Sequence, residues 1–520
     1  MEFSEKKKIV NDYIEKGFLL SPSFFESEVS FSEGFNIDES VEKELSVLNG
    51  DVASLLYSDI KDVNWKELER LRVFFEKNGN NRPYEALIKY AWKNKKEPEL
   101  KENKDIKVTF NYNKEILKKS VTNFVAYFND RFKKLEKILS SRQELSHLTS
   151  IARLKGKKER ETVSLIGLVV EKSVTANNHI ILTIEDQTGS TNVLVSKNNP
   201  EAYDLAKDII EDEVVGITGA GDENIVFANT VVFPDIPLQG EIKKSPEESY
   251  AIFLSDIHVG SNTFLEEKFE KFLDWLNGKV GSEKHKSVIE KIKYIFVAGD
   301  LVDGVGIFPG QEAELTIPDI YGQYERCAEL FSRIPKHINI VVCPGNHDAI
   351  RLSEPQPPII KDFTKPLTDL PNLTMVSNPS YVNIGSTKDF PGFDVLMYHG
   401  YSFDYLIANV DSIRNNGGYD RADLVMKYLL QRRHLAPNHK ATLYVPDIEG
   451  DNLIISKVPD FFVSGHIHKA AVSSYRGVDL ICGSCWQSIT KFQEKMGHNP
   501  EPARVPLVNL QSRETKILRF

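Results

Sequence analysis

Five short motifs in the C-terminal half of the chain combine residue types that bind metal ions. Carboxylates, imidazoles and an amide oxygen form a borderline-hard ligand set, which suits Mn²⁺, Fe²⁺ or Zn²⁺ better than Ca²⁺ or copper. Two such ions, about 3.5–4 Å apart, can activate a water and neutralise the charge that builds on a phosphate during in-line attack. The motifs are Asp256-Ile257-His258, Gly299-Asp300-Leu301-Val302-Asp303, Gly345-Asn346-His347-Asp348, His399-Gly400 and Gly465-His466-Ile467-His468.

Each motif directly follows an apolar run that is typical of a β-strand. The runs end at Ser255, Ala298, Val342, Tyr398 and Ser464. Helical patterns near 265–276, 319–333 and 401–433 separate some of them, which predicts an α/β domain over residues 248–520. Ligands collect beyond the carboxyl ends of strands in such domains, so one cleft would hold all five motifs. Each motif alone could be a turn, a loop or a pair of surface histidines, but the five together in this order favour a metal site.

The elements that precede this domain are predicted to form three further parts and a linker. Residues 1–92 carry helical patterns, and the charged stretch 93–122 is typical of a linker. Residues 123–160 are predicted to be a helical connector, and its helix would run from about Asn123 to Leu148. Its apolar face would consist of five residues at helical spacing, namely Phe124, Phe128, Phe132, Leu135 and Leu139.

The connector ends in a basic cluster, Arg153, Lys155, Lys157, Lys158 and Arg160. A solvated loop between domains is slightly favoured over a patch that contacts DNA phosphates, and both interpretations remain open.

Residues 161–237 change to the alternating period of β-strands. Turn residues separate five segments, and a helical stretch, Pro200 to Ile210, falls between the third and fourth. This order suggests an oligonucleotide-binding (OB) barrel. Such barrels usually stack bases on aromatic side chains, but this one offers few, so packing or partner docking competes evenly with DNA binding. The predicted strands are 163–172, 179–186, 190–195, 213–219 and 224–232.

Composition limits where the protein acts and how it could meet DNA. The 520 residues are too many for one hydrophobic core, and the net charge of −10 gives no overall attraction to nucleic acid. No apolar stretch reaches membrane-spanning length, and the charged start lacks the apolar core of a signal peptide, so we expect no membrane association and a cytoplasmic location. Four cysteines are too few for a disulfide framework, and Cys482 and Cys485 lack a second pair for zinc, so we expect packed thiols.

In this order, the five motifs resemble those of the calcineurin-like metallophosphoesterases, which include the double-strand-break repair nuclease. The resemblance is sharper to the small subunits of archaeal D-family DNA polymerases, and it extends upstream through the barrel to Phe124. Four further segments carry it: Pro309-Gly310-Gln311-Glu312, Glu354-Pro355-Gln356-Pro357, Gly483-Ser484-Cys485-Trp486-Gln487 and Phe124-Val125-Ala126-Tyr127-Phe128.

The resemblance implies roles for nine residues and a cofactor of two divalent ions, with Mn²⁺ expected first and Fe²⁺ or Zn²⁺ as alternatives. Asp256, His258, Asp300 and His468 would hold one ion. Asp300, Asn346, His399 and His466 would hold the other, with Asp300 bridging. His347 would be the general acid, oriented by the carboxylate of Asp303.

The same resemblance implies a 3′–5′ exonuclease that proofreads for a separate large catalytic subunit, as one half of a heterodimer that acts on DNA. Recruitment to a sliding clamp is also expected, although the sequence contains no convincing clamp-binding motif. Two alternatives remain open: a catalytically silent scaffold for the large subunit, and a phosphatase for proteins or small molecules.

Overall fold

The computed structural model describes residues 19–20, 47–48, 105–114, 119–156, 159–238 and 241–520. The chain divides into two compact units, residues 1–102 and 103–520. In the first unit the described residues form two short parallel strands, β1 (Leu19–Leu20) and β2 (Val47–Leu48). The predicted N-terminal helical domain otherwise lies outside the described residues. Within the described part of the chain, no helix is long and apolar enough to cross a bilayer.

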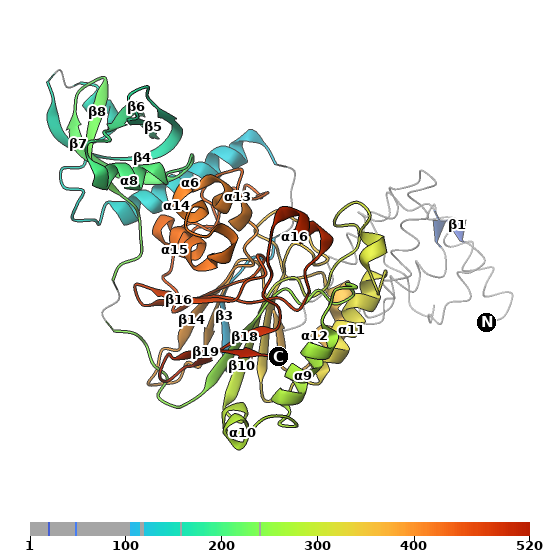
Figure 1. The fold of residues 1–520 in the computed structure, drawn as a ribbon. Helices are drawn as coiled ribbons and strands as arrows, with labels where there is room; N and C mark the ends of the chain where they lie inside the picture. Colours follow the sequence, from blue (N-terminus) through green and yellow to red (C-terminus); the bar gives the residue numbers. More distant parts are fainter. Residues whose placement is uncertain (1–18, 21–46, 49–104, 115–118, 157–158, 239–240) are drawn as a thin grey trace, which may run out of the picture. The chain divides into compact units, whose positions relative to one another are not determined.

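Two six-stranded sheets form the centre of the second unit (Figure 1). The first has the order β12-β11-β10-β9-β18-β19, with β9 to β12 parallel. Its strands are β9 (Tyr250–Leu254), β10 (Ile292–Ala298), β11 (Asn339–Cys343), β12 (Leu373–Met375), β18 (Arg504–Asn509) and β19 (Thr515–Arg519). The second has the order β16-β17-β15-β14-β13-β3. Its strands are β3 (Ile106–Asn111), β13 (Ser380–Ile384), β14 (Phe393–Met397), β15 (Phe461–Ser464), β16 (Ala471–Tyr475) and β17 (Val478–Cys482).

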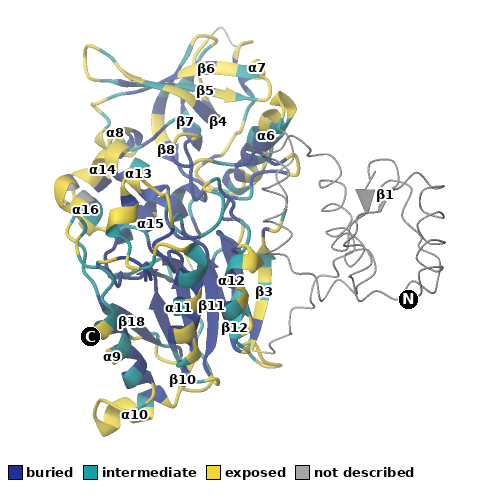
Figure 2. Ribbon diagram, turned by 90° about the vertical axis from the view of Figure 1, so that its right-hand side faces the viewer, coloured by how far each residue is buried: buried dark blue, intermediate teal, exposed yellow. Residues whose placement is uncertain are grey.

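Three hydrophobic clusters bind the layers together. The cluster between the sheets joins Phe253 and Phe296 of the first to Val395 and Phe461 of the second. A second cluster packs α9 (Glu266–Leu276) and α11 (Ile320–Ser332) on the first sheet, and a third packs α13 (Phe403–Asn409) and α15 (Ala422–Arg432) on the second. The central strands β11, β13, β14 and β15 are therefore buried throughout, while the edge strands β3, β12, β16 and β19 are partly exposed (Figure 2). The remaining helices are α10 (Glu283–Ile289), η3 (Gln311–Glu314), α12 (Lys361–Thr368), α14 (Asp411–Arg414), η4 (Gly418–Asp420) and α16 (Lys491–Met496).

Strand β3 corrects the predicted linker at 93–122. Residues 106–111 pair antiparallel with β13 at the edge of the second sheet. Ile106 is buried, while Val108 and Phe110 are partly buried, so the apolar residues alternate along the strand. The charged residues before and between them conceal this two-residue period in the sequence.

A closed five-stranded barrel forms from residues 161–232. The five predicted strands and the helix between the third and fourth are confirmed. Long apolar side chains from every strand, among them Leu165, Leu182, Val193, Ile217 and Val226, fill the interior. The elements are β4 (Glu161–Val174), β5 (Ile180–Asp186), β6 (Gly189–Val195), α8 (Pro200–Lys207), β7 (Val214–Gly221) and β8 (Ile225–Val232).

The helical connector is shorter and faces differently than predicted. Helix α6 (Val121–Leu139) ends well before 148, and the short α7 (Ile151–Leu154) follows it. Phe132, Leu135 and Leu139 are buried as expected, but Phe124 is 42% exposed and Phe128 is partly buried. Tyr127 and Arg131 are buried instead, because the Arg131 guanidinium reaches the Asp451 carboxylate, with Nε 2.7 Å from Oδ2.

Candidate metal centre

The carboxyl ends of strands from both sheets converge on one site, as the sequence predicted. The turns after these strands are tight, and five of the twelve non-glycine residues described with positive φ are predicted ligands. Side chains with a Cβ avoid this left-handed conformation, at a cost on the order of 1–3 kcal/mol each. Strain concentrated in this way marks a functional site. The five are Asp256, His258, Asp300, His466 and His468, with φ between 50° and 72°.

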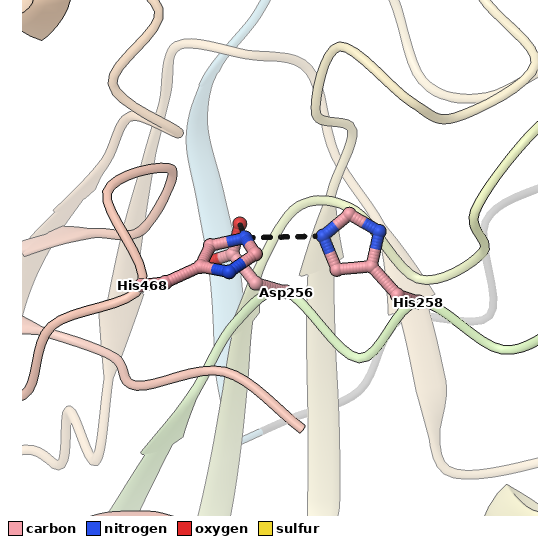
Figure 3. A group of neighbouring side chains, drawn as sticks. All are labelled: Asp256, His258 and His468. Carbon is pink, nitrogen blue, oxygen red and sulfur yellow. Dashed lines mark hydrogen bonds and ion pairs between the residues drawn. The ribbon is translucent and has the colours of Figure 1, made fainter. Parts of the chain in front are cut away.

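One ligand group consists of Asp256, His258 and His468 (Figure 3). The His258 and His468 rings point toward one another, with their Nε2 atoms 3.2 Å apart, and His468 Nε2 lies 3.4 Å from Asp256 Oδ1. Burial disfavours a charged His468 ring, but the neighbouring Cys485 and Asp256 outweigh burial, and the pKa of His468 rises well above the usual value. An environment that favours positive charge so strongly is suited to a cation.

A second group consists of Asp300, Asn346, His399 and His466, and with neutral imidazole rings the atoms that face one another would all be acceptors. His399 Nδ1 donates to the Ala298 carbonyl oxygen at 2.7 Å, so Nε2 of the neutral ring carries a lone pair. That atom lies 3.0 Å from Asn346 Oδ1 and 3.3 Å from Asp300 Oδ2. His466 Nε2 donates to Asp404 at 2.9 Å, so its Nδ1, 3.0 Å from the same Asn346 oxygen, is also an acceptor. Acceptors facing acceptors in a buried site fit a bound metal ion.

Asp300 lies between the two groups. Its Oδ2 is 3.3 Å from His399 Nε2 and 3.9 Å from His258 Nε2. Burial opposes ionisation of Asp300, but the surrounding histidines outweigh it and hold its pKa well below the usual value. The opposite holds for His399: burial disfavours its charge, yet Asp300 and Asp256 raise its pKa to about 10. The carboxylates of the centre therefore favour positive charge beside them. Protons on the histidines supply this charge where no metal ion is bound.

Asp303 orients His347 through its main chain and not through its carboxylate. His347 Nδ1 lies 2.8 Å from the main-chain oxygen of Asp303. The carboxylate instead accepts from His258 Nδ1 at 3.1 Å and from the amides of Gln487 and Gln311 at 3.1 and 2.9 Å. The Asp303 carboxylate therefore lies near the His347 ring without a hydrogen bond to it. Asp303 supports the ligand His258, because a residue in a strand-end turn can present its main-chain and side-chain oxygens in different directions.

Asp404, on α13, is a site residue that the sequence did not reveal. It accepts from His466 Nε2 at 2.9 Å and from the Tyr419 hydroxyl at 2.8 Å. Burial opposes its ionisation, but His466 outweighs burial and lowers the pKa of Asp404 to about 2. No sequence motif surrounds Asp404. Only the fold brings helix α13 next to the end of β15, which carries His466.

Two glycines allow the crowding at the strand ends. A Cβ on Gly345 would collide with the Asp300 carboxylate and with its main-chain nitrogen. Gly299 has φ +85°, and a Cβ there would meet His399 Nδ1 and the Gly345 backbone. The neighbouring Asp348 carboxylate accepts from Gly345 N at 2.9 Å and from the Tyr324 hydroxyl at 3.1 Å, which fixes the loop. Burial, with the charge on Asp300, raises the pKa of Asp348 to about 7.

A cleft of about 570 Å³ opens over the centre. It is lined by seven of the nine predicted residues, namely His258, Asp300, Asp303, Asn346, His347, His466 and His468. The other two, Asp256 and His399, are fully buried.

The described residues of the basic cluster do not line this cleft. Arg153, Lys155 and Arg160 are exposed, and Lys157 and Lys158 lie outside the described residues. The guanidinium of Arg160 lies 4.2 Å from the Phe227 ring centroid and pairs with Asp222. Cys482 and Cys485 are free, buried thiols, as expected.

Comparison with known proteins identifies the family. The family of the B subunits of DNA polymerases alpha and epsilon matches residues 251–472, a span that includes all predicted ligands. The DNA polymerase II small subunit of Methanothermobacter thermautotrophicus is 40% identical over 390 residues, which are 75% of this chain and 78% of that protein. The corresponding protein of Archaeoglobus fulgidus is 40% identical over 386 residues, 74% of this chain and 75% of that protein. The chain belongs to the family of DNA polymerase II small subunits.

The D-family resemblance seen in the sequence is thereby confirmed. The DNA polymerase II small subunit of Pyrococcus furiosus is also 40% identical, over 400 residues, but the match covers 63% of its length. A solved archaeal phosphodiesterase aligns over 52% of this chain and 99% of its own at 12% identity, and its TM-score of 0.26 is too low to support an argument.

Proposed function

We propose that this small subunit is a two-metal-dependent 3′–5′ exodeoxyribonuclease that proofreads for a replicative DNA polymerase. The observation that carries the proposal is the group around His399, whose facing atoms are acceptors when the ring is neutral and which a metal ion would complete. Asp256, His258, Asp300 and His468 would hold one ion, and Asp300, Asn346, His399 and His466 the other. The donor set suits Mn²⁺ first, with Fe²⁺ or Zn²⁺ as alternatives. Bound ions would polarise the phosphate and provide a nucleophilic water at neutral pH.

His347 is the proposed general acid. Its Nδ1 donates to the Asp303 main-chain oxygen, so the departing sugar oxygen would take its proton from Nε2 of the protonated ring. Burial lowers the pKa of His347, which makes the protonated ring a stronger acid. The direction of cleavage rests on the resemblance to D-family small subunits.

The proposed partners are DNA and a large catalytic subunit, with a sliding clamp recruiting the assembled heterodimer in the cytoplasm. The five-stranded barrel, with α8 between β6 and β7, supports an OB-fold assignment. Glu213, just before β7, accepts hydrogen bonds from Tyr428 and Arg432 of α15. This buried contact supports a barrel that is fixed on the phosphoesterase domain and available to DNA or to the large subunit on its other sides.

The decisive experiment is Mn²⁺-dependent degradation of a labelled single strand and of a mismatched primer end. Wild type should shorten both stepwise from the 3′ end. His347→Ala should reduce turnover by about 10²- to 10⁴-fold with metal content unchanged, because His347 is assigned as an acid and not a ligand. His337→Ala, which changes an exposed histidine outside the cleft, is the matched control.

Metal lost together with activity in His347→Ala would contradict the assignment of His347. No cleavage by wild type, alone and with the large subunit, would favour the silent scaffold. Faster hydrolysis of small phosphomonoesters than of DNA would favour a phosphatase.

A further inference from the structure

The loop between Asp303 and Gln311 presents apolar side chains to solvent beside an ionic cleft. Val305, Ile307 and Phe308 are 43%, 38% and 38% exposed. Phe308 lines the cleft, and Ile307 does not. The Phe308 side chain is therefore open to solvent at the place where it lines the cleft.

The loop is anchored firmly at its base. Gln311 is fully buried, and its side-chain amide donates to the main-chain and carboxylate oxygens of Asp303, both at 2.9 Å. Its side-chain oxygen accepts from Ile307 N at 2.9 Å. Gly304 N donates to Gln323 Oε1, also at 2.9 Å. These contacts fix Phe308 in position relative to Asp303, and therefore relative to the metal ligands. These hydrogen bonds hold the backbone of the loop, and none of them involves the exposed Phe308 ring.

Other aromatic rings line the same cleft, and they come from three separate segments of the chain. Tyr401 follows β14, with its ring centroid 5.7 Å from that of the ligand His466. Tyr419 and His498 both line the cleft, with centroids 4.0 Å apart. A small phosphoester needs no such surroundings. Flat aromatic faces next to a phosphate-binding site match nucleobases, which stack on aromatic side chains with little regard to sequence.

We propose that Phe308 is a base-stacking residue, which holds the terminal base of an unpaired DNA strand while the adjoining phosphate occupies the metal centre. This inference rests on the proposed nuclease function and adds a residue that selects its substrate, through strand ends whose bases are free to stack. A paired terminus would have to unstack and separate first, so a mismatched or single-stranded end is the preferred substrate.

The test compares Phe308→Ala, Phe308→Trp and the control Ile307→Ala in the full-length chain, with and without the large subunit. The three substrates are a single-stranded oligonucleotide, the same strand ending in abasic residues, and bis(p-nitrophenyl) phosphate, each with Mn²⁺. Phe308→Ala should lower kcat/KM on the normal strand by about 5- to 100-fold, the effect of losing one stacked base. It should leave the abasic strand and the small ester unchanged. Phe308→Trp should restore activity on the normal strand, and Ile307→Ala should match wild type.

A binding measurement separates this inference from the nuclease proposal. An oligonucleotide with a terminal 2-aminopurine should lose fluorescence on binding wild type and Phe308→Trp, but not Phe308→Ala. Quenching of this kind without hydrolysis would preserve the base-stacking role and reject the nuclease. Equal losses on all three substrates, or no loss on the normal strand, would overturn the base-stacking role. Loss of the large subunit from Phe308→Ala, with no change in 2-aminopurine quenching, would also overturn it in favour of partner docking.

Discussion

Two buried polar clusters in this chain have similar residue types and opposite character. One joins Arg131 of α6 to Asp451 and His434, all at most 4% exposed, and the other is the metal centre. In the first, Asp451 Oδ2 lies 2.7 Å from both Arg131 Nε and His434 Nε2. His434 Nδ1 accepts from Ala436 N at 3.0 Å, so the Nε2 proton points at the carboxylate. All three guanidinium nitrogens of Arg131 and the Nε2 proton of His434 meet an acceptor.

The metal centre lacks this complementarity. When its ring is neutral, His399 is held in the tautomer that turns a lone pair toward the oxygens of Asp300 and Asn346. Burying charge and lone pairs without a partner is costly, and a protein retains such an arrangement where a ligand completes it. The difference teaches that a complete buried cluster indicates structure, whereas an incomplete one indicates binding. The predictions below test this distinction.

The largest effect is expected from Asp300→Ala, which removes the carboxylate shared by the two ligand groups. Both ions should lose proper occupancy and DNA hydrolysis should cease, since each ion would lose a ligand at once. Metal content by mass spectrometry and exonuclease assays provide the measurement. Asp369→Ala, at an exposed helix end, is the matched control. Full metal content in Asp300→Ala would show that the two groups do not share a ligand.

Breaking the complete cluster should affect stability and not metal binding. Arg131→Met leaves the Asp451 charge buried without its guanidinium and should lower the free energy of unfolding by about 3–5 kcal/mol. Arg131→Met/Asp451→Asn removes both charges and should recover part of that loss. Denaturant unfolding measures the first effect, and Mn²⁺ content should remain unchanged. A change in Mn²⁺ content would mean that the two clusters are coupled.

The sequence revealed the metal centre but not the cluster of Arg131, Asp451 and His434. Asp256, Asp300 and His466 were predictable because each sits in a short motif directly after an apolar strand, and strand ends meet in an α/β domain. Arg131 and Asp451 are 320 positions apart, with no motif at either, so only the folded chain shows that they pair. The burial of Arg131 also explains why the predicted face of α6 is confirmed at Phe132, Leu135 and Leu139 but not at Phe124 and Phe128, since helical periodicity counts arginine as exposed.

Strand β3 and Asp404 were missed for the same physical reason. Both depend on a tertiary neighbour: β3 on the edge of β13, and Asp404 on His466. Asp303 is the opposite case, because the residue was predicted but its contact with His347 was not. Its place in the motif was predicted, but whether its main chain or its carboxylate meets His347 depends on backbone geometry that residue types do not encode.

Metal addition should stabilise the chain through the incomplete cluster alone. Binding one Mn²⁺ at about 100 times its dissociation constant should raise the free energy of unfolding by roughly 2.7 kcal/mol. Calorimetric unfolding with Mn²⁺ and with a chelator measures the difference. Arg131→Met should show the same increment from its lower baseline, and Asp300→Ala should lose it. An equal increment in Asp300→Ala would place the stabilising ion elsewhere.

The smallest predicted effect tests how Asp404 completes one half of the centre. Asp404→Ala removes the acceptor that keeps the proton on His466 Nε2, so Nδ1 is no longer held ready as a ligand. Loss of such a supporting contact typically weakens metal binding by about 10- to 100-fold. Because His466 is assigned to only one ion, a Mn²⁺ titration should show one weakened step and one unchanged step. Tyr419→Phe, which removes only the outer bond to Asp404, should change neither step by more than a few-fold. If both steps weaken equally in Asp404→Ala, His466 serves the centre as a whole, and the division into two ligand groups is wrong.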